Sequence, residues 1–435
     1  MAYKNPRKED SCIHSNAIVK IITPPAQPFQ DQDLRGLNFF LEKMALSLDQ
    51  RSPHLWGTIA PQLASSTLAL RHGLVALSGI YEQKVYGTNS KEYSLSSYNT
   101  AIRMLLNNKK QPVKLVDQLL GCLLFIVIEF LQGNIPMAVE LIKVGRRIIF
   151  ACRQIRKTAT QQAFLEPIAD TFRRLDAHIL ELCHHALEPS LSFGKCWNYL
   201  DSERKPPDIL NFTDQVQACH RLGLLLNTWQ VARRSGLVNH AKFHEVLLQW
   251  RQKFESLQDV DHKTKINRGM WWQELEIMFL LQAELDRVSQ VFSISNQAWD
   301  NYEEKFLKIV SLAEEFVSTP GVSIPVFSLC PNITTVMLRT VIRCRSPEIR
   351  RRAIQVIEVA NTQEGLLKPE WTLQITRRIV ALEEEGLSVK HAKDIPETSR
   401  LRDVSIDWDA SAPSALNVKY YIKGKAIVER LGPES

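Results

Sequence analysis

The stretch from residue 114 to residue 150 reads KLVDQLLGCLLFIVIEFLQGNIPMAVELIKVGRRIIF. Over Leu119–Leu131 the side chains are apolar almost without a break, and the breaks are Gly121, Cys122 and Glu129. A helix that is apolar on every side must be buried in a large core or in a membrane. We therefore expect a helix here that the rest of the chain covers.

The second half of this stretch predicts a turn followed by an amphipathic helix. Gln132-Gly133-Asn134 is typical of a helix end, because Gly and Asn accept the left-handed backbone found there. Pro136 then suits the first turn of a new helix. The residues that follow divide into an apolar stripe (Ala138, Leu141, Ile142, Ile148 and Ile149) and charged positions outside it (Lys143, Arg146 and Arg147). Residues 114–150 thus predict a helical hairpin with one very apolar helix.

Helical periodicity continues through most of the chain. Leu34, Leu37 and Leu41 recur at three- and four-residue steps, which is the period of a helix with one buried face. Further helices are expected near residues 66–86, 92–106, 160–187, 213–234, 238–254, 267–285, 296–317, 330–362 and 369–385. Near the C-terminus, Leu401–Trp408 and Val418–Ile422 alternate as strands do. The sequence predicts an all-α fold, a multi-helical array of packed hairpins with a short β-like C-terminal tail.

Composition along the chain divides it into five parts. Residues 1–33 carry charges and prolines with few apolar groups, so we expect a flexible linker. Residues 34–187 form a helical subdomain that contains the apolar hairpin. Proline and glycine punctuate residues 188–211, which we interpret as a loop-rich connection. A second helical subdomain follows over residues 212–385, and residues 386–435 form an extended C-terminal tail.

Overall composition is that of a folded globular protein in a reducing compartment. With 435 residues and 45% hydrophobic content the chain can bury a large core, and its formal charge of +7 is only mildly basic. The eight cysteines are scattered and mostly lie in apolar helical patterns, which argues against a disulfide framework. No secretory signal is visible, and the apolar run of about 13 residues is shorter than the about 20 that a bilayer requires. We therefore expect no membrane span.

No motif in the sequence predicts catalysis, and we expect a protein that is not an enzyme. The chain has no Gly-rich phosphate loop and no Gly-x-Ser-x-Gly elbow. Cys183, His184 and His185 form one crowded patch, whereas structural zinc needs four ligands that usually come as two close pairs. His240 and His244 have the spacing of a zincin helix but lack its glutamate. We predict no catalytic residue, no cofactor-binding residue and no metal ligand.

Two groups of basic residues are candidates for nucleic-acid contact. They are Arg146, Arg147, Arg153, Arg156 and Lys157 at the end of the hairpin, and Arg339, Arg343, Arg345, Arg350, Arg351 and Arg352 further along. Neither group lies in a helix-turn-helix or basic-zipper pattern. We therefore expect these side chains to pair within the chain, with Glu348 and Glu358 among the partners, or to lie at helix C-termini. The acidic runs Glu314–Glu315 and Glu383–Glu385 are expected to be solvated.

A series of stretches in fixed order carries a family resemblance. They are Arg35–Phe40, Trp56, Ala69–Ser78, Tyr98–Ile102, Cys122–Asn134, Phe172–Asp176, Cys344–Ile354, Glu364–Gly365 and Ile395–Arg400. Together they resemble the C-terminal regulatory (middle homology) region of fungal Zn₂Cys₆ binuclear-cluster transcription factors. The resemblance spans about residues 29–422 and is most specific in the apolar hairpin.

The resemblance implies an α-helical regulatory module that acts in transcriptional control, in the nucleus or otherwise in the cytoplasm. In fungi such relatives often accompany secondary-metabolite gene clusters. Its implied partners are other transcriptional regulators or a homodimer partner, together with a small-molecule effector. The family's zinc module needs six cysteines before this region, and here only Cys12 precedes Cys122. Sequence-specific DNA binding is therefore not carried over. The alternative is an α-helical scaffold or small-molecule-binding module with no transcriptional role.

Overall fold

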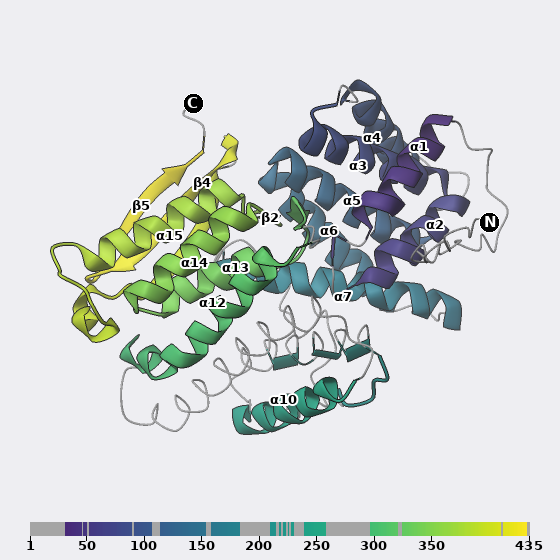
Figure 1. The fold of residues 1–435 in the computed structure, drawn as a ribbon. Helices are drawn as coiled ribbons and strands as arrows, with labels where there is room; N and C mark the ends of the chain where they lie inside the picture. Colours follow the sequence, from purple (N-terminus) through teal and green to yellow (C-terminus); the bar gives the residue numbers. More distant parts are fainter. Residues whose placement is uncertain are drawn as a thin grey trace, which may run out of the picture.

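The protein is described from a computed structural model, shown in Figure 1. It describes residues 31–45, 47–49, 52–88, 91–106, 114–153, 158–182, 209–214, 239–257, 296–320, 324–409 and 412–432, with a few separate residues between 217 and 229. Within these residues the fold is mostly helical, with two small sheets in the C-terminal part. The predicted all-α class is confirmed. The predicted N-terminal linker and the connection over residues 188–211 lie almost wholly outside the described ranges.

The N-terminal helices form one body, coloured purple to blue in Figure 1. In order they are α1 (Asp31–Phe39), the π-helical turn η1 (Phe40–Met44), a second such turn η2 (Leu55–Ile59), α2 (Ala60–Ser66), α3 (Leu68–Tyr86), α4 (Lys91–Leu106), α5 (Leu115–Gln132), α6 (Ile135–Arg153) and α7 (Ala159–Leu182). These bounds agree with the helical periods in the sequence, including the predicted hairpin of α5 and α6.

Helix α5 is the buried centre of this body, as predicted. Every residue of Leu119–Leu131 is buried, and α3, α4, α6 and α7 contact the helix. The helix ends at Gly133, whose left-handed φ of 80° lets the Asn134 N–H donate to the Glu129 carbonyl at 2.8 Å. The Glu129 carboxylate accepts hydrogen bonds from the Tyr98 hydroxyl at 2.6 Å and the Asn134 amide at 2.8 Å. These bonds allow a carboxylate inside an otherwise apolar helix.

Helix α6 approaches α7 closely at Gly145. A Cβ atom at this position would lie 2.1 Å from Cε1 of Phe172, so the contact requires glycine. The next residue, Arg146, is only 2% exposed, and its Nε lies 3.2 Å from Oδ2 of Asp176. The prediction that Arg146 lies on the outer charged face is wrong, because α7 covers this side chain and supplies its counter-charge.

In the middle of the chain the described residues contain one continuous helix, α10 (His240–Glu255). It begins at Asn239, whose side chain accepts from the Lys242 N–H and so caps the first turn. The helix agrees with the one predicted over residues 238–254. The helix expected near residues 213–234 is described only in pieces, and that near residues 267–285 lies outside the described ranges.

The C-terminal helices form a second body, coloured green to yellow in Figure 1. Its elements are the 3₁₀ turn η4 (Asn296–Tyr302), α12 (Glu303–Ser318), β1 (Phe327–Ser328), α13 (Ile333–Arg343), α14 (Pro347–Ala360), β2 (Gln363–Glu364), α15 (Pro369–Glu384), the 3₁₀ turns η5 (Ala392–Asp394) and η6 (Glu397–Ser399), β3 (Asp403–Asp409), β4 (Ala412–Ile422) and β5 (Lys425–Leu431). Proline begins both α14 and α15, in the position where its missing N–H leaves no helical bond unmade.

The C-terminal strands form an antiparallel sheet in the order β3-β4-β5. Leu416, Val418 and Tyr420 alternate along β4 with their side chains buried. Strand β4 contacts α15, and β3 and β4 also contact α6 of the first body. The strand-like alternation predicted for this region is confirmed, and the C-terminal segment packs on the helices as a sheet.

The two bodies meet at the short parallel pair of β1 and β2. The Leu329 N–H, just after β1, donates to the Leu48 carbonyl at 2.7 Å. From β2, Nε2 of Gln363 donates to the Phe130 carbonyl at 2.9 Å, and its Oε1 accepts from Nζ of Lys84. Main-chain groups of α5 and its surroundings are thus tied to the C-terminal body by direct hydrogen bonds.

Candidate functional site

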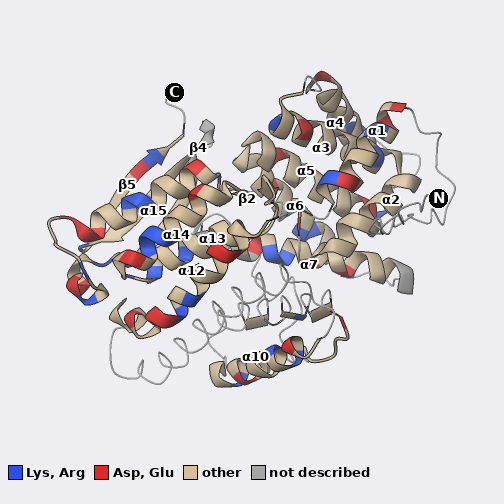
Figure 2. Cartoon of the chain, in the orientation of Figure 1, with Lys and Arg blue, Asp and Glu red and all other residues tan. Residues whose placement is uncertain are grey.

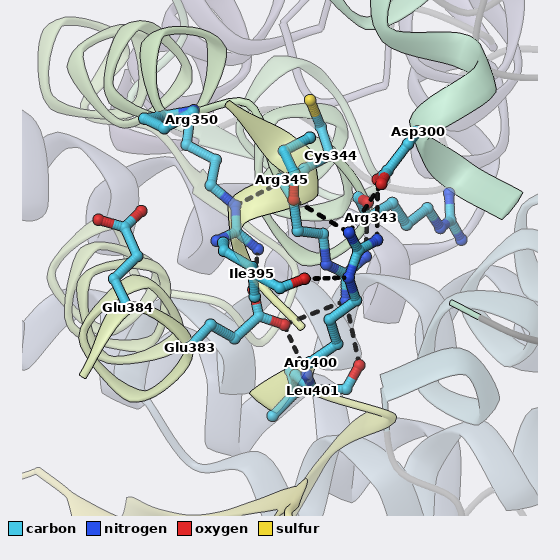
Figure 3. Close-up of polar contacts among 12 residues, drawn as sticks. Asp300, Arg343, Cys344, Arg345, Arg350, Glu383, Glu384, Ile395, Arg400 and Leu401 are labelled. Atoms are coloured by element: carbon cyan, nitrogen blue, oxygen red, sulfur yellow. Dashed lines mark hydrogen bonds and ion pairs between the residues drawn. The ribbon is translucent and has the colours of Figure 1, made fainter. Parts of the chain in front are cut away.

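A buried group of arginines and carboxylates surrounds Glu383, and we call Asp300, Arg345, Arg350, Glu383 and Arg400 the Glu383 cluster (Figure 3). Its members come from five different elements and turns, which the fold brings together. Arg345 lies in the turn between α13 and α14, and Arg350 lies in the first half of α14. Glu383 is in the last turn of α15, Arg400 follows η6, and Asp300 belongs to η4.

The Glu383 carboxylate joins three chain segments. Its Oε1 lies 3.1 Å from Nη2 of Arg345 and accepts from the Leu401 N–H at 2.5 Å. Its Oε2 accepts from Nη2 of Arg350. All three ion-paired side chains are at most 1% exposed. Such charge-assisted bonds in a dry environment hold α15 to the α13–α14 turn and to the segment leading into β3.

A second carboxylate, that of Asp300, holds Arg400 in a bidentate pair. The two distances are 2.8 Å from Nη1 to Oδ1 and 2.7 Å from Nη2 to Oδ2. The same guanidinium donates to the carbonyls of Ile395 and Ala392, both at 3.0 Å. Arg400 is therefore satisfied by the elements that flank it, and it fixes η5 and η6 against η4.

The electrostatics of the cluster favour a positioning role over proton transfer. Burial lowers the pKa of Arg345, and the neighbouring Arg350 and Arg400 lower it further, while Glu383 opposes them. Burial also raises the pKa of the adjacent Cys344 thiol to about 11. Cys344 is therefore a thiol at neutral pH, not the thiolate that nucleophilic chemistry needs.

A second buried network links α7 to the turn after η1. Nη2 of Arg174 lies 2.5 Å from Oδ2 of Asp49 and donates to Oγ of Ser52 at 2.7 Å, while Nη1 pairs with Asp170. Burial alone would lower the pKa of Arg174, but Asp49 and Asp170 raise it above its usual range. This arginine stays charged and connects a loop to a core helix.

A third buried charge, Glu364 of β2, caps α13. Its carboxylate accepts the N–H groups of Asn332, Thr334 and Thr335 at 2.7, 2.8 and 2.9 Å. These are the free donors at the start of a helix, where a negative charge is also favoured by the helix dipole. Burial raises the pKa of Glu364, and the three N–H bonds act against that rise.

Four arginines of the second predicted basic group, Arg345, Arg350, Arg351 and Arg352, form ion pairs within the chain, as expected. Besides the pairs of Arg345 and Arg350 with Glu383, Arg351 lies 2.6 Å from Glu384 and Arg352 lies 2.7 Å from Glu314. Arg352 also reaches the predicted partner Glu348 at 3.5 Å, whereas Glu358 pairs with Arg377. Figure 2 shows the resulting intermixture of basic and acidic residues over α12–α15.

The first predicted basic group is split by the structure. Arg146 is buried against α7, whereas the next residue, Arg147, is exposed. Arg156 and Lys157 lie outside the described ranges, and nothing is described of the side chain of Arg153. The structure therefore does not bring this group together as one surface.

The prediction that Glu383 is solvated is wrong, although its neighbour Glu385 is exposed. Glu383 is buried because of its position along α15. Ile375, Ile379 and Glu383 follow one another at four-residue steps and so share one face of the helix, and the two isoleucines are fully buried. The helical period of α15 therefore contained the signal that Glu383 faces the core. The pairing of Arg400 with Asp300, 100 residues away, has no such signal in the sequence.

His240 and the described cysteines lie in the core. His240 is buried and accepts a hydrogen bond from Nε1 of Trp229 at 2.9 Å. Cys122, Cys152, Cys330 and Cys344 are buried and carry thiols that form no disulfide, as their apolar surroundings predict. The patch of Cys183, His184 and His185 lies outside the described ranges. Among the described residues, no group of three His, Cys, Asp or Glu side chains could hold a metal ion.

Helix α5 is long and apolar enough to cross a membrane, judged by length and composition alone, and within the described chain it is the one such helix. Its 18 residues exceed the apolar run counted in the sequence. However, 78% of this segment is buried inside the fold, and a core helix of a soluble protein meets the same criterion. The packing around α5 accounts for its composition.

Comparisons of the chain with protein-family models, with curated proteins and with solved structures found no match.

Proposed function

We propose that the chain is a regulatory protein of the transcription-factor type that works through protein or ligand contacts. The observation that carries the proposal is that Arg345, Arg350, Arg351 and Arg352 of the second basic group are ion-paired within the chain. Arg345 and Arg350 are at most 2% exposed and are bonded to Glu383, and Arg351 and Arg352 have carboxylate partners of their own.

Binding to DNA requires arginines and lysines that can reach phosphates and base edges. A guanidinium that is buried and already paired cannot do so without unfolding its surroundings, which costs several kcal/mol. The residues from 343 to 352 therefore organise the C-terminal body. This supports a role in which helical surfaces contact other regulators or a small-molecule effector, while sequence is read by a different polypeptide or module.

The family resemblance of the sequence is the reason for preferring a transcriptional role within this class. Its stretches Phe172–Asp176, Cys344–Ile354 and Glu364–Gly365 supply Arg174, Arg345, Arg350 and Glu364, the residues at the centre of the three buried networks. In this proposal the module acts in the nucleus and adjusts the activity of partners on target genes of a fungus, among which a secondary-metabolite cluster is the first to examine.

The proposal is tested by deleting the gene and measuring transcripts, together with the location of a fluorescently tagged chain. We expect nuclear accumulation and a coordinated change in a limited set of transcripts. A protein that stays outside the nucleus, with an unchanged transcript profile, would contradict the proposal and favour the scaffold or ligand-binding alternative. Turnover of a metabolite by the purified chain would instead indicate an enzyme.

The absence of intrinsic DNA readout is tested separately with the purified chain. We expect no stoichiometric zinc and only weak DNA binding that fades as salt is raised from about 50 to 200 mM. A Zn²⁺ content of two ions per chain, or binding that distinguishes one DNA sequence from its scrambled form, would overturn this part of the proposal.

A further inference from the structure

Strand β5 is the outer strand of the C-terminal sheet and pairs on one side only within the described chain. The sheet order is β3-β4-β5, and the strands β3 and β4 contact α6, whereas β5 lies along the outer side of the C-terminal body (Figure 1). Among the described residues, no backbone hydrogen bond joins β5 to a segment other than β4. We call the side of β5 that faces away from β4 the β5 edge.

The register of the hairpin formed by β4 and β5 shows which main-chain groups face this edge. Its turn consists of Lys423 and Gly424, which both have a positive φ (51° and 73°), as in a type I′ turn. The pair that closes such a turn, here Ile422 and Lys425, exchanges hydrogen bonds, and pairs of this kind alternate with pairs that do not. The N–H and C=O groups that point away from β4 therefore belong to Ala426, Val428 and Arg430.

The side chains of the same three residues are exposed. Val428 is 57% exposed, and Ala426 and Arg430 are exposed beside it. The opposite face of β5 is turned towards α15, where Glu429 pairs with Arg378 at 2.7 Å. A strand that is added at the β5 edge would therefore meet main-chain donors and acceptors with a large apolar side chain next to them.

Both ends of the β5 edge carry positive charge. Lys425 and Arg430 are exposed, and no ion pair joins either of them to the described part of the chain. The one acid of the strand, Glu429, is already held by Arg378. Charged side chains limit which strands can pair with an edge. The edge of a second copy would bring the same positive charges, whereas an acidic strand would supply the missing counter-charges.

We propose that the β5 edge binds an extended acidic segment of a partner protein, which becomes the fourth strand of the sheet. In the antiparallel arrangement the segment carries one acid opposite Arg430, an apolar residue opposite Val428 and a second acid opposite Lys425. Residues that lie opposite each other in a sheet share one face, so the apolar residue contacts Val428 on the exposed face. The pattern that this edge selects is acid-x-apolar-x-x-acid.

This partner is one of the protein contacts of the proposed function, and in that respect the inference rests on that function. Binding of a peptide to the purified chain does not depend on where the protein accumulates in the cell or on which transcripts change. A chain that binds no acidic strand would therefore refute the role of the β5 edge alone, whereas an unchanged transcript profile would refute the transcriptional role alone.

The first test measures binding of a labelled, end-blocked peptide, Asp-Thr-Val-Thr-Thr-Glu, to the full chain by fluorescence anisotropy. We expect saturable binding that weakens about tenfold or more when both acids are replaced by lysine. Replacing the valine of the peptide by proline keeps its charge but removes a main-chain donor, and it should weaken binding by a similar factor. Equal binding of the proline peptide would indicate charge attraction alone and would overturn the proposal, as would the absence of binding.

The second test changes the β5 edge itself. Val428→Pro removes an N–H that faces the edge and makes no bond to β4, so we expect loss of peptide binding from a chain that remains folded. The matched variant Val428→Thr keeps this N–H and should bind within a few-fold of the unmodified chain. Thermal unfolding of both variants verifies that the sheet is intact. Binding by Val428→Pro that equals that of the unmodified chain would overturn the proposal.

A charge reversal tests the proposed selectivity for an acidic strand. Arg430→Glu should weaken binding of the acidic peptide and strengthen binding of the lysine peptide, whereas Lys308→Glu, at an exposed position of α12, should change neither. An unchanged preference in Arg430→Glu would contradict the proposal. Sedimentation of the unmodified chain identifies the other possible occupant, because self-association that disappears in Val428→Pro would show that the edge binds a second copy instead.

Discussion

At the scale of single residues, neighbours in the sequence of α15 have very different roles. Glu383 is fully buried and holds two arginines and a main-chain N–H, whereas Glu384 pairs with Arg351 near the surface. The difference arises from the helical turn of about 100° between consecutive residues, which points one carboxylate inward and the next outward. A buried charge destabilises the folded state unless it is paired. Removing Glu383 would therefore leave Arg345 and Arg350 as buried charges without their counter-charge.

We predict that Glu383→Gln lowers the free energy of unfolding by about 3–5 kcal/mol, because two buried guanidiniums lose their counter-charge. The control Glu384→Gln removes a pair in which Arg351 is 54% exposed, and it should cost about 0–1 kcal/mol. Urea denaturation of the three proteins measures both values. Equal stability of the two variants would show that the Glu383 cluster does not stabilise the C-terminal body.

Lys84 provides a test of pH dependence at the junction of the two bodies. Burial lowers its pKa to about 8, the nearby Lys368 lowers it further, and Glu370 opposes the change. In the unfolded chain the pKa of a lysine is about 10.4, so the unfolded state binds more protons between the two values. The contribution of Lys84 should therefore make the protein more stable as pH rises from about 8 towards about 10.4.

The measurement is the free energy of unfolding of the unmodified chain and of Lys84→Met at several pH values from 7 to about 10.5. The rise attributable to Lys84 should disappear in the variant. Lys308→Met, an exposed position on α12, should keep the same pH profile as the unmodified chain. A profile that is identical in all three proteins would refute the assigned pKa.

At the scale of elements, α5 shows how much one helix contributes to the fold. Its run Leu119–Leu131 is buried throughout, and four other helices, α3, α4, α6 and α7, contact it. In contrast, α6 contacts α5, α7, β3 and β4 and still keeps an exposed line of residues, which includes Met137, Glu140, Val144 and Arg147.

We predict that Leu124→Asp abolishes folding of the N-terminal body. Leu124 is fully buried, and an unpaired charge there costs several kcal/mol against a total stability of about 5–15 kcal/mol. The same change at Leu106, which is 77% exposed at the end of α4, should have little effect. Thermal unfolding followed by circular dichroism distinguishes the two, and near-normal stability of Leu124→Asp would show that α5 is not buried.

At the scale of the whole molecule, the two bodies are joined by specific hydrogen bonds around β2. Gln363 is the centre of this junction, because its amide donates to the carbonyls of Phe130 and Gly365 and accepts from Lys84. It is only 2% exposed, so its partners cannot easily turn to water if it is removed. The junction makes the stability of the bodies interdependent.

We predict that Gln363→Leu lowers the free energy of unfolding by about 1–3 kcal/mol, since it removes the buried amide that donates to the Phe130 and Gly365 carbonyls and accepts from Lys84. Gln374→Leu, at an exposed position of α15, is the control and should change stability by less than about 0.5 kcal/mol. Urea denaturation again gives the comparison. If the two variants are equally stable, the hydrogen bonds of Gln363 do not hold the bodies together.

Helical periodicity was sufficient to predict most elements of this protein. The apolar run of α5, its end at Gly133, the hairpin with α6 and the alternation of β3 and β4 all follow from side-chain spacing and from the backbone preferences of glycine and proline. The burial of Glu383 and Arg146 was not predicted. In both cases the local composition is charged, and the counter-charges, Arg345 and Asp176, lie 38 and 30 residues away, on other elements.

What the sequence determined by itself is therefore the position of most of the described helices and of strands β3 and β4, because these depend on residues within a few positions of one another. Only the tertiary structure decided which charges face inward and which apolar side chains stay uncovered. Arg345, Arg350 and Glu383 became a buried cluster because α13, α14 and α15 pack together, and Arg146 is buried because α7 covers it and supplies Asp176. Whether a side chain is buried depends on which elements pack against it, and residues far apart in the sequence decide that.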